Sequence, residues 1–496
     1  MALAEHPAPD TFEVRDPRSG EVVARYPSTT PAQVRAAVER AREAADWWAR
    51  LGWEGRRSRL RGWAGVLGRR RDELAAVVQR ENGKNADDAL LEIAMALPHL
   101  AWAAANARRV LGPRRVHSGL FSANQTSLLE YQPVGVVGVI GPWNYPVFTP
   151  MGSIAHALAA GNAVVYKPSE YTPGVGVLLA ETLAEAMPDA PAPLLTVVTG
   201  PAETGAALCR AGVGKLAFTG SARTGRAVMA ACAETLTPVL MECGGKDALI
   251  VDDGADVEAA ADAALWGGLS NAGQTCAGIE RVYATDAVYE EFVDRLVSGA
   301  RDVLPGTPGG YGPITMPGQL EVIGRHIDEA IARGARALVG GRGAVRGAYV
   351  DPTVLVDVPE DAAAVREETF GPTLTVTRVA DAEEALRLAN DSGYGLGGAV
   401  YARSRRRGLD LARRLRGGMT SVNSVIAFAG VPALPFGGVG ESGFGRVHGD
   451  DGLREFARAK AITVQRFALP VPVTSFRRHA RTMPMLARAV SFRSRR

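Results

Sequence analysis

Hydrophobic and polar positions follow two patterns along the first half of the chain. Between about residues 30 and 110 apolar residues recur every three or four positions, as in Pro31–Ala41, which predicts amphipathic helices. From residue 134 onward, short continuous apolar runs typical of buried strands alternate with helical stretches. Because strands joined by crossover helices form parallel sheets, we expect a doubly wound α/β sheet. The apolar runs are Gly135–Ile140, Ala163–Tyr166, Leu194–Val198, Lys215–Phe218 and Val239–Met241.

A second alternation of this kind begins after Ile250. Its pattern predicts helices over 256–266 and 288–303, and strands over 281–284 and 374–379. A chain of 496 residues exceeds the usual size of one hydrophobic core. We therefore interpret the second alternation as a second α/β domain rather than as a continuation of the first sheet.

The composition is that of a folded globular protein, with 47% hydrophobic and 22% charged residues. The chain has no apolar stretch of membrane-spanning length and no signal peptide at its start, so we expect a cytoplasmic protein. Four cysteines without a CxxC pair favour neither a disulfide framework nor a cysteine-based metal site, and we expect no metal. Cysteine chemistry, if present, involves a single thiol.

Basic residues are distributed unevenly. The last 26 residues contain seven arginines and no acid, although the net charge of the chain is only +3. This tail also contains Met485, Leu486, Val490 and Phe492, so it is either a basic amphipathic segment with weak affinity for anionic membrane surfaces or a solvated extension. Lysine is rare: the chain has five lysines against 51 arginines.

Two motifs follow the first two predicted strands. The segment from Gly141 to Pro146 (GPWNYP) is a rigid turn that would fix the Asn144 amide, either as an oxyanion-hole donor or as a cap of the next helix. The segment from Lys167 to Glu170 (KPSE) ends the second strand. An acid there accepts hydrogen bonds from a ribose and repels a 2′-phosphate, which favours NAD over NADP. A surface ion pair is the alternative.

A glycine turn opens a helix at Ser221, within the segment from Phe218 to Gly225. The free N–H groups of such a helix end bind a pyrophosphate, although a serine cap beside a packing glycine has the same pattern. The segment 438–443 matches GxGxxG literally but does not follow a clear strand, so we interpret it as a structural turn.

The central pair of residues is Glu242 and Cys276, which are 34 positions apart. Cys276 is flanked by small and polar residues that leave a thiol accessible, whereas Glu242 stands at a strand end beside two glycines. A thiol nucleophile and a carboxylate base are what the formation and hydrolysis of a thioester require.

Taken together, these motifs resemble the aldehyde dehydrogenase superfamily over residues 12–468. Seven segments occur in the family's order and spacing, which makes the resemblance highly specific. They are Gly141–Pro146, Lys167–Glu170, Phe218–Ser221, Glu242–Lys246, Gly273–Cys276, Glu367–Pro372 and Pro435–Gly438.

The resemblance implies oxidation of an aldehyde to a carboxylic acid with NAD, or with NADP. Cys276 would form a thiohemiacetal and then a thioester, Asn144 would hold the oxyanion, and Glu242 would activate the hydrolytic water. The resemblance implies that Lys167 is both a catalytic and a cofactor-binding residue. It also implies that Tyr145, Phe428 and Phe436 form walls of a tunnel for apolar aldehydes. The implied cofactor site comprises Ile140, Trp143, Lys167, Glu170, Gly200, Gly220, Ser221, Gly225, Glu368 and Phe370.

The implied fold is a Rossmann-type parallel-sheet cofactor domain, a second α/β catalytic domain and a small β oligomerisation arm. We assign residues 1–115 and 134–242 to the first, 243–455 to the second, and 116–133 with 456–468 to the arm, leaving 469–496 as the basic tail. The arm implies a homodimer or homotetramer.

Three positions depart from the family pattern or bear on the substrate. Cys243 and Asp247 replace a leucine and a small or amide residue that are commoner in the family. Ser270 stands where some semialdehyde dehydrogenases have an arginine, which disfavours a short acidic semialdehyde. Two alternative functions stay open: a CoA-acylating relative, which Glu242 disfavours, and a silent family member that acts as a binding protein.

Overall fold

The structure is a computed structural model that describes residues 10–119, 122–468 and 473–493. Its first sheet has the strand order β19-β9-β8-β5-β6-β7, and all the predicted runs of the first domain are strands in it. Five of its strands are parallel, and only the short β19 is antiparallel to its neighbour. The strands are β5 (Val136–Ile140), β6 (Ala163–Lys167), β7 (Leu195–Val197), β8 (Lys215–Gly220), β9 (Val239–Cys243) and β19 (Gly443–Phe444).

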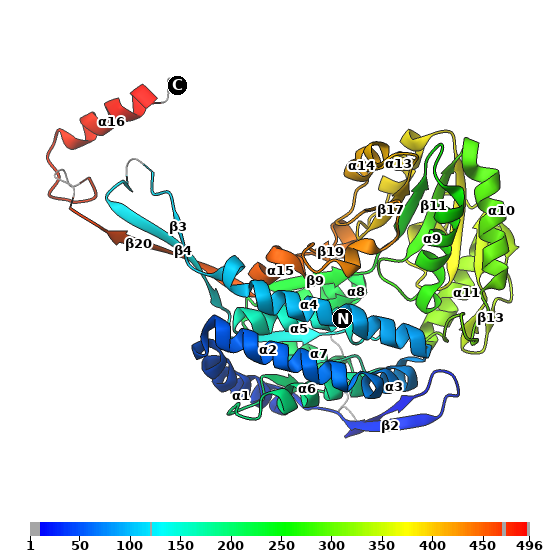
Figure 1. Ribbon diagram of the computed structural model, residues 1–496, viewed down its shortest axis with the longest axis horizontal. Coiled ribbons are helices and arrows are strands. Elements are labelled where there is room, and N and C mark those ends of the chain that lie inside the picture. The colour runs from blue at the N-terminus through cyan, green and yellow to red at the C-terminus, as the bar shows by residue number, and fades with distance from the viewer. Residues whose placement is uncertain (1–9, 120–121, 469–472, 494–496) are drawn as a thin grey trace.

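Helices cover both faces of this sheet (Figure 1). The predicted helical region before residue 111 forms four helices that pack on the crossover helices, so this prediction is confirmed. Trp48, which is fully buried, donates from Nε1 to the carbonyl oxygen of Leu158 over 2.7 Å. The helices are α1 (Pro31–Arg50), α2 (Gly52–Arg69), α3 (Arg71–Asn82), α4 (Ala86–Leu111), α5 (Phe148–Ala160), α6 (Pro173–Ala186), α7 (Ala202–Cys209) and α8 (Ala222–Ala233). A hairpin of β1 (Thr11–Arg15) and β2 (Val22–Pro27) precedes them.

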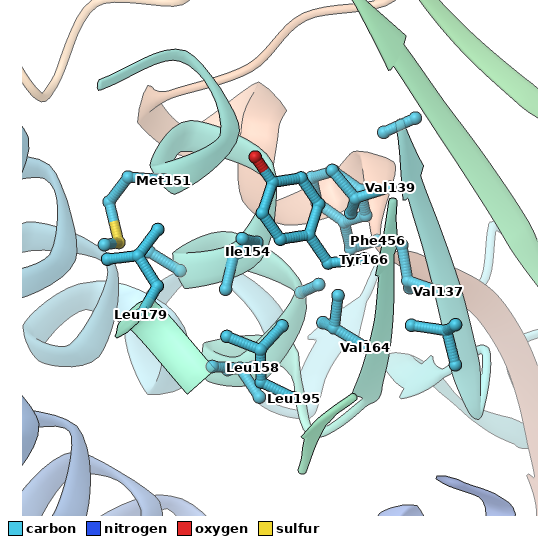
Figure 2. Close-up of a cluster of buried hydrophobic side chains, with 14 of the residues drawn as sticks. Val137, Val139, Met151, Ile154, Leu158, Val164, Tyr166, Leu179, Leu195 and Phe456 are labelled. Atoms are coloured by element: carbon cyan, nitrogen blue, oxygen red, sulfur yellow. The ribbon is translucent and has the colours of Figure 1, made fainter. Parts of the chain in front are cut away.

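The core of this domain lies between β5 and β6 on one side and α5 and α6 on the other. Figure 2 shows Val137 and Val164 from the strands facing Ile154, Leu158 and Leu179 from the helices. Burial of these apolar side chains contributes roughly 25 cal/mol per Å² removed from water. The packing fixes where each strand ends, and hence where the polar residues after β5, β6 and β9 lie.

The second sheet has the order β12-β15-β16-β11-β10-β17-β18, which confirms a second α/β domain. Helices α9 and α10 cover one face, and α13 and α14 cover the other. The strands are β10 (Asp247–Val251), β11 (Ile279–Thr285), β12 (Arg336–Val339), β15 (Thr353–Val356), β16 (Thr373–Val379), β17 (Gly398–Tyr401) and β18 (Ser421–Val422). The helices are α9 (Val257–Leu269), α10 (Asp286–Asp302), α11 (Pro317–Ala332), α12 (Ala363–Arg366), α13 (Ala382–Asn390) and α14 (Arg405–Arg414). A small hairpin, β13 (Val345–Arg346) with β14 (Tyr349–Val350), completes the domain.

Residues 443–455, which we expected in the second domain, pack on the first. Strand β19 pairs with β9, and α15 (Gly449–Glu455) packs against α4 and α5. The buried Leu453 and Phe456 join the apolar core of the first domain. The chain therefore returns to the first sheet before it enters the arm.

The expected arm is a three-stranded sheet that projects from the body (Figure 1). Strand β20 (Ala457–Gln465) pairs antiparallel with β4 (Gln125–Pro133), and β3 (Arg114–Val116) lies on the far side of β4. Helix α16 (Thr482–Arg493) follows in the tail, with Met485 and Val490 exposed. The side chain of Phe492 and residues 494–496 lie outside the described residues. None of the helices in the described ranges is long and apolar enough to cross a membrane.

Candidate active site

The loop after β5 brings the Asn144 side chain to the loop that carries Cys276. Asn144 is 4% exposed, and its Nδ2 donates to the carbonyl oxygen of Gln274 over 2.9 Å. In return, the Asn271 side chain donates to the backbone oxygen of Asn144 over 3.1 Å. Helix α5 begins after Val147 without a side-chain cap, so Asn144 does not cap the helix. The amide is fixed by the opposite domain instead.

The loop that precedes Cys276 has an unusual backbone. Asn271 and Ala272 lie in the left-handed region, with φ of 53° and 57°, which costs roughly 1–2 kcal/mol for each residue with a side chain. Amide side chains hold this conformation: Gln274 donates to the carbonyl oxygen of Asn271 over 2.9 Å and accepts from the N–H of Thr315 over 2.8 Å. Backbone strain maintained by its surroundings is typical of functional sites.

Glu242 lies near the end of β9 and is also 4% exposed. Its Oε1 finds no hydrogen-bond partner within the described parts of the chain. A Cβ at Gly437 would lie 2.6 Å from this oxygen, so only glycine leaves the carboxyl group room here. Burial raises the pKa of Glu242 well above its usual value, whereas the charge of Arg446 opposes this shift. A buried carboxyl group with a raised pKa suits a general base that acts near neutral pH.

The Cys276 thiol is partly exposed and lies in the same electrostatic field. Burial raises its pKa to about 12, and the negative charges of Glu242, Glu368 and Asp247 contribute in the same direction. The resting thiol is therefore protonated at neutral pH. The other three cysteines are buried, and of these only Cys243 adjoins the site.

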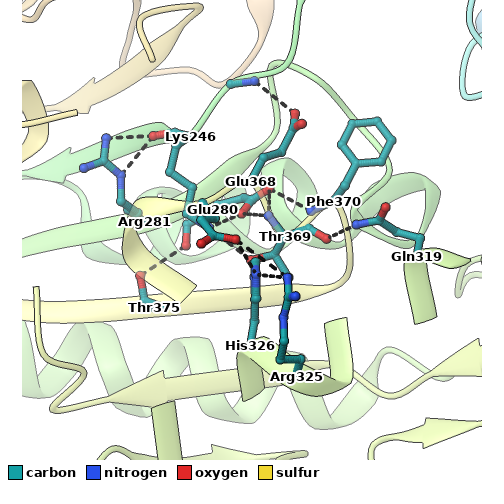
Figure 3. Close-up of polar contacts among 12 residues, drawn as sticks. Lys246, Glu280, Arg281, Gln319, Arg325, His326, Glu368, Thr369, Phe370 and Thr375 are labelled. Atoms are coloured by element: carbon teal, nitrogen blue, oxygen red, sulfur yellow. Dashed lines mark hydrogen bonds and ion pairs between the residues drawn. The ribbon is translucent and has the colours of Figure 1, made fainter. Parts of the chain in front are cut away.

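Glu368 faces the two glycines after Cys243. Its Oε1 accepts from the Gly245 N–H over 3.0 Å, a bond drawn at the Glu368 carboxyl group in Figure 3. A Cβ at Gly244 would overlap this carboxyl group. Burial and then the charge of Glu280 raise the pKa of Glu368 to about 8. Two residues further on, the Phe370 ring contacts the edge of Trp143 at a centroid distance of 5.5 Å.

Eight of the ten predicted cofactor residues lie at or just beyond the carboxyl ends of β5, β6, β7 and β8, whereas Glu368 and Phe370 come from the second domain. Lys167 is 4% exposed and donates over 3.1 Å to Glu170, whose side chain is 41% exposed, so the pair has one buried and one exposed member. Ser221 caps α8 by accepting from the Thr224 N–H over 3.2 Å. A Cβ at Gly225 would lie 3.2 Å from the Cys243 sulfur. Ile140 ends β5, Gly220 ends β8, and Gly200 follows β7.

This arrangement fits a dinucleotide. Helix α8 presents its N-terminal N–H groups at the carboxyl edge of a parallel sheet, where pyrophosphates bind. Glycine at positions 225 and 244 lets α8 and the Glu368 carboxyl group pack closely at this edge, because a Cβ there would meet the Cys243 sulfur and the Glu368 carboxyl group respectively. The literal GxGxxG segment, by contrast, is a turn in which Ser442 donates to the carbonyl oxygen of Gly244 over 2.7 Å.

The predicted tunnel residues Phe428 and Phe436 pack with Cys276 in one apolar cluster, and their ring centroids are 6.1 Å apart. Tyr145 contacts the loop that carries Cys276, with its hydroxyl 3.0 Å from Thr275 Oγ1. Sequence reasoning missed other members of the cluster. Four of them stand within three positions of a predicted residue, whereas Met95, Leu396 and Met419 have no motif that could have found them. The missed members are Met95, Phe148, Ala277, Leu396, Met419, Ile426 and Ala429.

Comparisons with known proteins agree with this geometry. A family model described as the aldehyde dehydrogenase family matches residues 4–462. The chain is 37% identical to a 4,4'-diapolycopene aldehyde oxidase of Methylomonas sp, over 93% of this chain and 87% of the relative. It is 36% identical to a probable NADP(+) succinate-semialdehyde dehydrogenase of Sinorhizobium fredii, over 93% of this chain and 96% of the relative. The structure of betaine aldehyde dehydrogenase from Staphylococcus aureus in complex with NAD+ superposes with a TM-score of 0.88, at 30% identity, over 94% and 96% of the two chains.

Proposed function

The chain belongs to the aldehyde dehydrogenase family, and from this premise we propose that it oxidises an apolar aldehyde to its carboxylic acid through a thioester on Cys276. The observation that carries the proposal is the junction of Asn144 with the nucleophile loop, because it unites an amide donor and a thiol from different domains. Activity on aldehydes with NAD(P) is common to the family.

In the first step the Cys276 sulfur attacks the aldehyde carbon, and the thiol proton passes to solvent water as the S–C bond forms. The carbonyl oxygen becomes an oxyanion, which the Asn144 amide and the Cys276 N–H stabilise. Nδ2 of Asn144 carries two hydrogens, and the bond to Gln274 uses one of them. The bound nicotinamide supplies the hydride acceptor, which leaves a thioester on the sulfur.

Glu242 has its task in the second step. Its carboxylate accepts a proton from a water molecule, whose oxygen attacks the thioester carbon, and the C–S bond then breaks to release the acid and the thiol. The unpartnered Oε1 of Glu242 supports this role, because a base must keep an acceptor free for water. The CoA-acylating alternative needs no such base and is not favoured.

Ten residues would hold the cofactor. Lys167 and Glu170 would bind the adenosine ribose, Ser221 and its helix the pyrophosphate, and Glu368 the nicotinamide ribose. Because the Glu170 side chain is 41% exposed at the end of β6, where it would accept from a ribose hydroxyl and repel a 2′-phosphate, we propose a preference for NAD over NADP. The other residues are Ile140, Trp143, Gly200, Gly220, Gly225 and Phe370.

The apolar cluster around Cys276 supports the substrate class. Ser270, which occupies the position of a substrate-binding arginine in some semialdehyde dehydrogenases, begins the short helix η2 (Ser270–Gly273) before the nucleophile. Phe428 and Phe436 offer surface to a hydrocarbon chain rather than a cation to a carboxylate. We therefore propose that this chain differs in substrate from the succinate-semialdehyde relative.

The arm and the tail carry two further proposals. The edge of the projecting sheet would join subunits into a homodimer or homotetramer. The tail, with its arginines and the exposed Phe476, Met483, Met485 and Val490, would make weak contact with anionic membranes. Co-sedimentation with phosphatidylserine vesicles that is lost on deleting 475–496 would support the second proposal, and no binding by the full chain would end it.

The test of function measures NADH and NADPH formation with octanal, benzaldehyde and succinate semialdehyde, with and without CoA. We expect CoA-independent activity and a kcat/KM for octanal about tenfold or more above that for succinate semialdehyde, since each buried methylene contributes about 0.8 kcal/mol. The reverse preference would contradict the substrate class. If no aldehyde were oxidised while NAD still bound, the enzyme assignment would be wrong.

A further inference from the structure

Most of the few lysines in this chain are buried. Of the five, only Lys460 is exposed, although arginine outnumbers lysine about tenfold. Each of the other four pairs with a glutamate. Two of these pairs are almost fully buried on both sides, and both contact loops of the active site. The pairs are Lys84–Glu92, Lys167–Glu170, Lys215–Glu455 and Lys246–Glu280.

The Lys84–Glu92 pair lies beneath the loop that carries Asn144. Glu92, on α4, accepts at Oε1 from the backbone N–H groups of Val147 and Phe148 over 2.7 and 3.0 Å, while its Oε2 pairs with Lys84. The Lys84 ammonium in turn lies 3.8 Å from the centroid of the Tyr145 ring. One carboxylate and one ammonium thus fix the segment that follows Asn144.

The Tyr145 hydroxyl extends this network to the nucleophile loop, because it lies 3.0 Å from Thr275 Oγ1. Thr275 is the residue before Cys276, and Phe148 belongs to the apolar cluster around the thiol. The Lys84–Glu92 pair therefore acts on the side of the site where the aldehyde binds.

The Lys246–Glu280 pair lies beneath the loop that carries Glu368 (Figure 3). Glu280 accepts from the backbone N–H groups of Thr369 and Phe370 over 2.9 and 3.0 Å, and its Oε2 pairs with Lys246. The Lys246 ammonium also contacts the Thr369 hydroxyl over 3.0 Å. Phe370 has a φ of 50°, a left-handed conformation that a phenylalanine keeps only when its surroundings impose it.

The two pairs have the same physical role, which is to satisfy and fix two backbone N–H groups beside the active site. Each contact presents two adjacent N–H groups that no helix or sheet hydrogen bond satisfies, at the start of α5 in one case and in an irregular loop in the other, and such groups need acceptors. A carboxylate accepts both, and a compact ammonium balances its charge without the volume and planar fork of arginine. Breaking such a pair on one side leaves an uncompensated buried charge and displaces the loop.

We propose that the two buried pairs position the two halves of the site separately, Lys84–Glu92 for the aldehyde and Lys246–Glu280 for the cofactor. All four are positioning residues, since they act through Tyr145, Phe148, Thr369 and Phe370. The proposal rests on the proposed function of the site. It requires that each pair controls the affinity of one ligand and leaves the other unchanged.

The test compares Glu92→Gln with Glu280→Gln, which are the same change in the same kind of pair. The affinity for NAD is measured by calorimetry and the KM for octanal by NADH formation at saturating NAD. Glu280→Gln should weaken NAD binding about tenfold with the octanal KM within about twofold. Glu92→Gln should leave NAD binding unchanged and lower kcat/KM for octanal about 10- to 100-fold, as expected for a loop displaced by about 1 Å.

Glu455→Gln is the control, because it breaks the partly buried Lys215–Glu455 pair, which contacts neither loop. It should lower the melting temperature without changing NAD affinity or the octanal KM. Equal losses of both affinities in Glu92→Gln and Glu280→Gln, or a loss of the wrong one, would overturn the proposal. So would a lower melting temperature with both affinities unchanged.

If a single variant does not fold, the charge-neutral doubles Lys84→Met/Glu92→Gln and Lys246→Met/Glu280→Gln remove each pair without leaving a lone charge. The same split between NAD affinity and octanal KM is then expected of the doubles, and its absence would contradict the proposal. NAD binding by calorimetry stays readable even if no aldehyde is turned over. A failure of the proposed function can therefore be told apart from a failure of the proposal about the two lysine–glutamate pairs.

Discussion

The side-chain amide of Asn144 donates to the carbonyl oxygen of Gln274 over 2.9 Å, two residues before Cys276. Asn144 follows β5 of the first sheet, whereas Cys276 precedes β11 of the second. This hydrogen bond makes one rigid unit of two loops from different domains. An oxyanion donor that is held before the reaction needs no reorganisation when charge develops, which is how such donors accelerate acyl transfer.

Asn144→Ala should therefore reduce kcat for octanal about 10²- to 10³-fold, the usual effect of losing one oxyanion donor. NAD affinity should not change, because no predicted cofactor contact is removed. Steady-state kinetics and calorimetry on the same preparation provide both values. A kcat within about threefold of the wild type would contradict the role of this amide.

Cys276→Ser should abolish aldehyde oxidation and preserve NAD binding. The serine hydroxyl is a far weaker nucleophile at neutral pH, and burial beside the carboxyl groups that raise the pKa of Cys276 also disfavours a serine alkoxide. Cys243→Ser is the matched control and should retain most of the activity. If activity survived in Cys276→Ser and disappeared in Cys243→Ser, the nucleophile would be Cys243 and the role given to Cys276 would be wrong.

The rate at which Cys276 is alkylated should reflect the negative charges around its thiol. Burial and the charges of Glu242, Glu368 and Asp247 raise its pKa to about 12, so iodoacetamide should react slowly at pH 7 and faster as the pH rises. Asp247→Asn and Glu368→Gln should each react faster than wild type at pH 9, where these acids, with pKa values of about 7 and about 8, are ionised in the wild type. Peptide mass spectrometry gives the rate. Slower alkylation in both variants would contradict the claim that these two acids raise the pKa of Cys276.

The buried cluster of His99, His156 and His448 should make the fold sensitive to acid. Burial lowers the pKa of His99 to about 4 and of His156 to about 3, and that of His448 well below its usual value. Below pH 6.5 the unfolded chain therefore binds protons that the folded chain does not, so stability falls as the pH falls.

His156→Leu removes one of these titrations. Between pH 7 and pH 5 the variant should lose about 2 kcal/mol less unfolding free energy than the wild type, which urea unfolding at both pH values measures. His479→Leu, which changes an exposed histidine, is the control and should match the wild type. An identical acid loss in His156→Leu would exclude this histidine as a cause.

The buried strands and the motifs after them were predictable because their signals are local. Runs such as Ala163–Tyr166 are fully apolar, and Glu242 and Cys276 stand in segments whose order and spacing are specific. The return of residues 443–455 to the first sheet was not predictable, since a two-residue strand has no periodicity. Met95 and Leu396 join the apolar cluster around Cys276 from segments far apart in sequence, and no local pattern distinguishes them from other core residues.

The buried lysine pairs show the same limit. The rarity of lysine singled out Lys84 and Lys246, but their partners Glu92 and Glu280 are 8 and 34 positions away, within otherwise ordinary stretches. Only the fold shows that each glutamate accepts two backbone N–H groups of an active-site loop.

The most direct test of a thioester on Cys276 is the mass of Glu242→Gln after reaction with NAD+ and octanal. Glutamine cannot accept a proton from water, so the first step should proceed once and then stop. We expect a burst of about one NADH per active site and an octanoyl group on the peptide that contains Cys276. Steady turnover near the wild-type rate, or an acyl group on Cys243 instead, would contradict the mechanism.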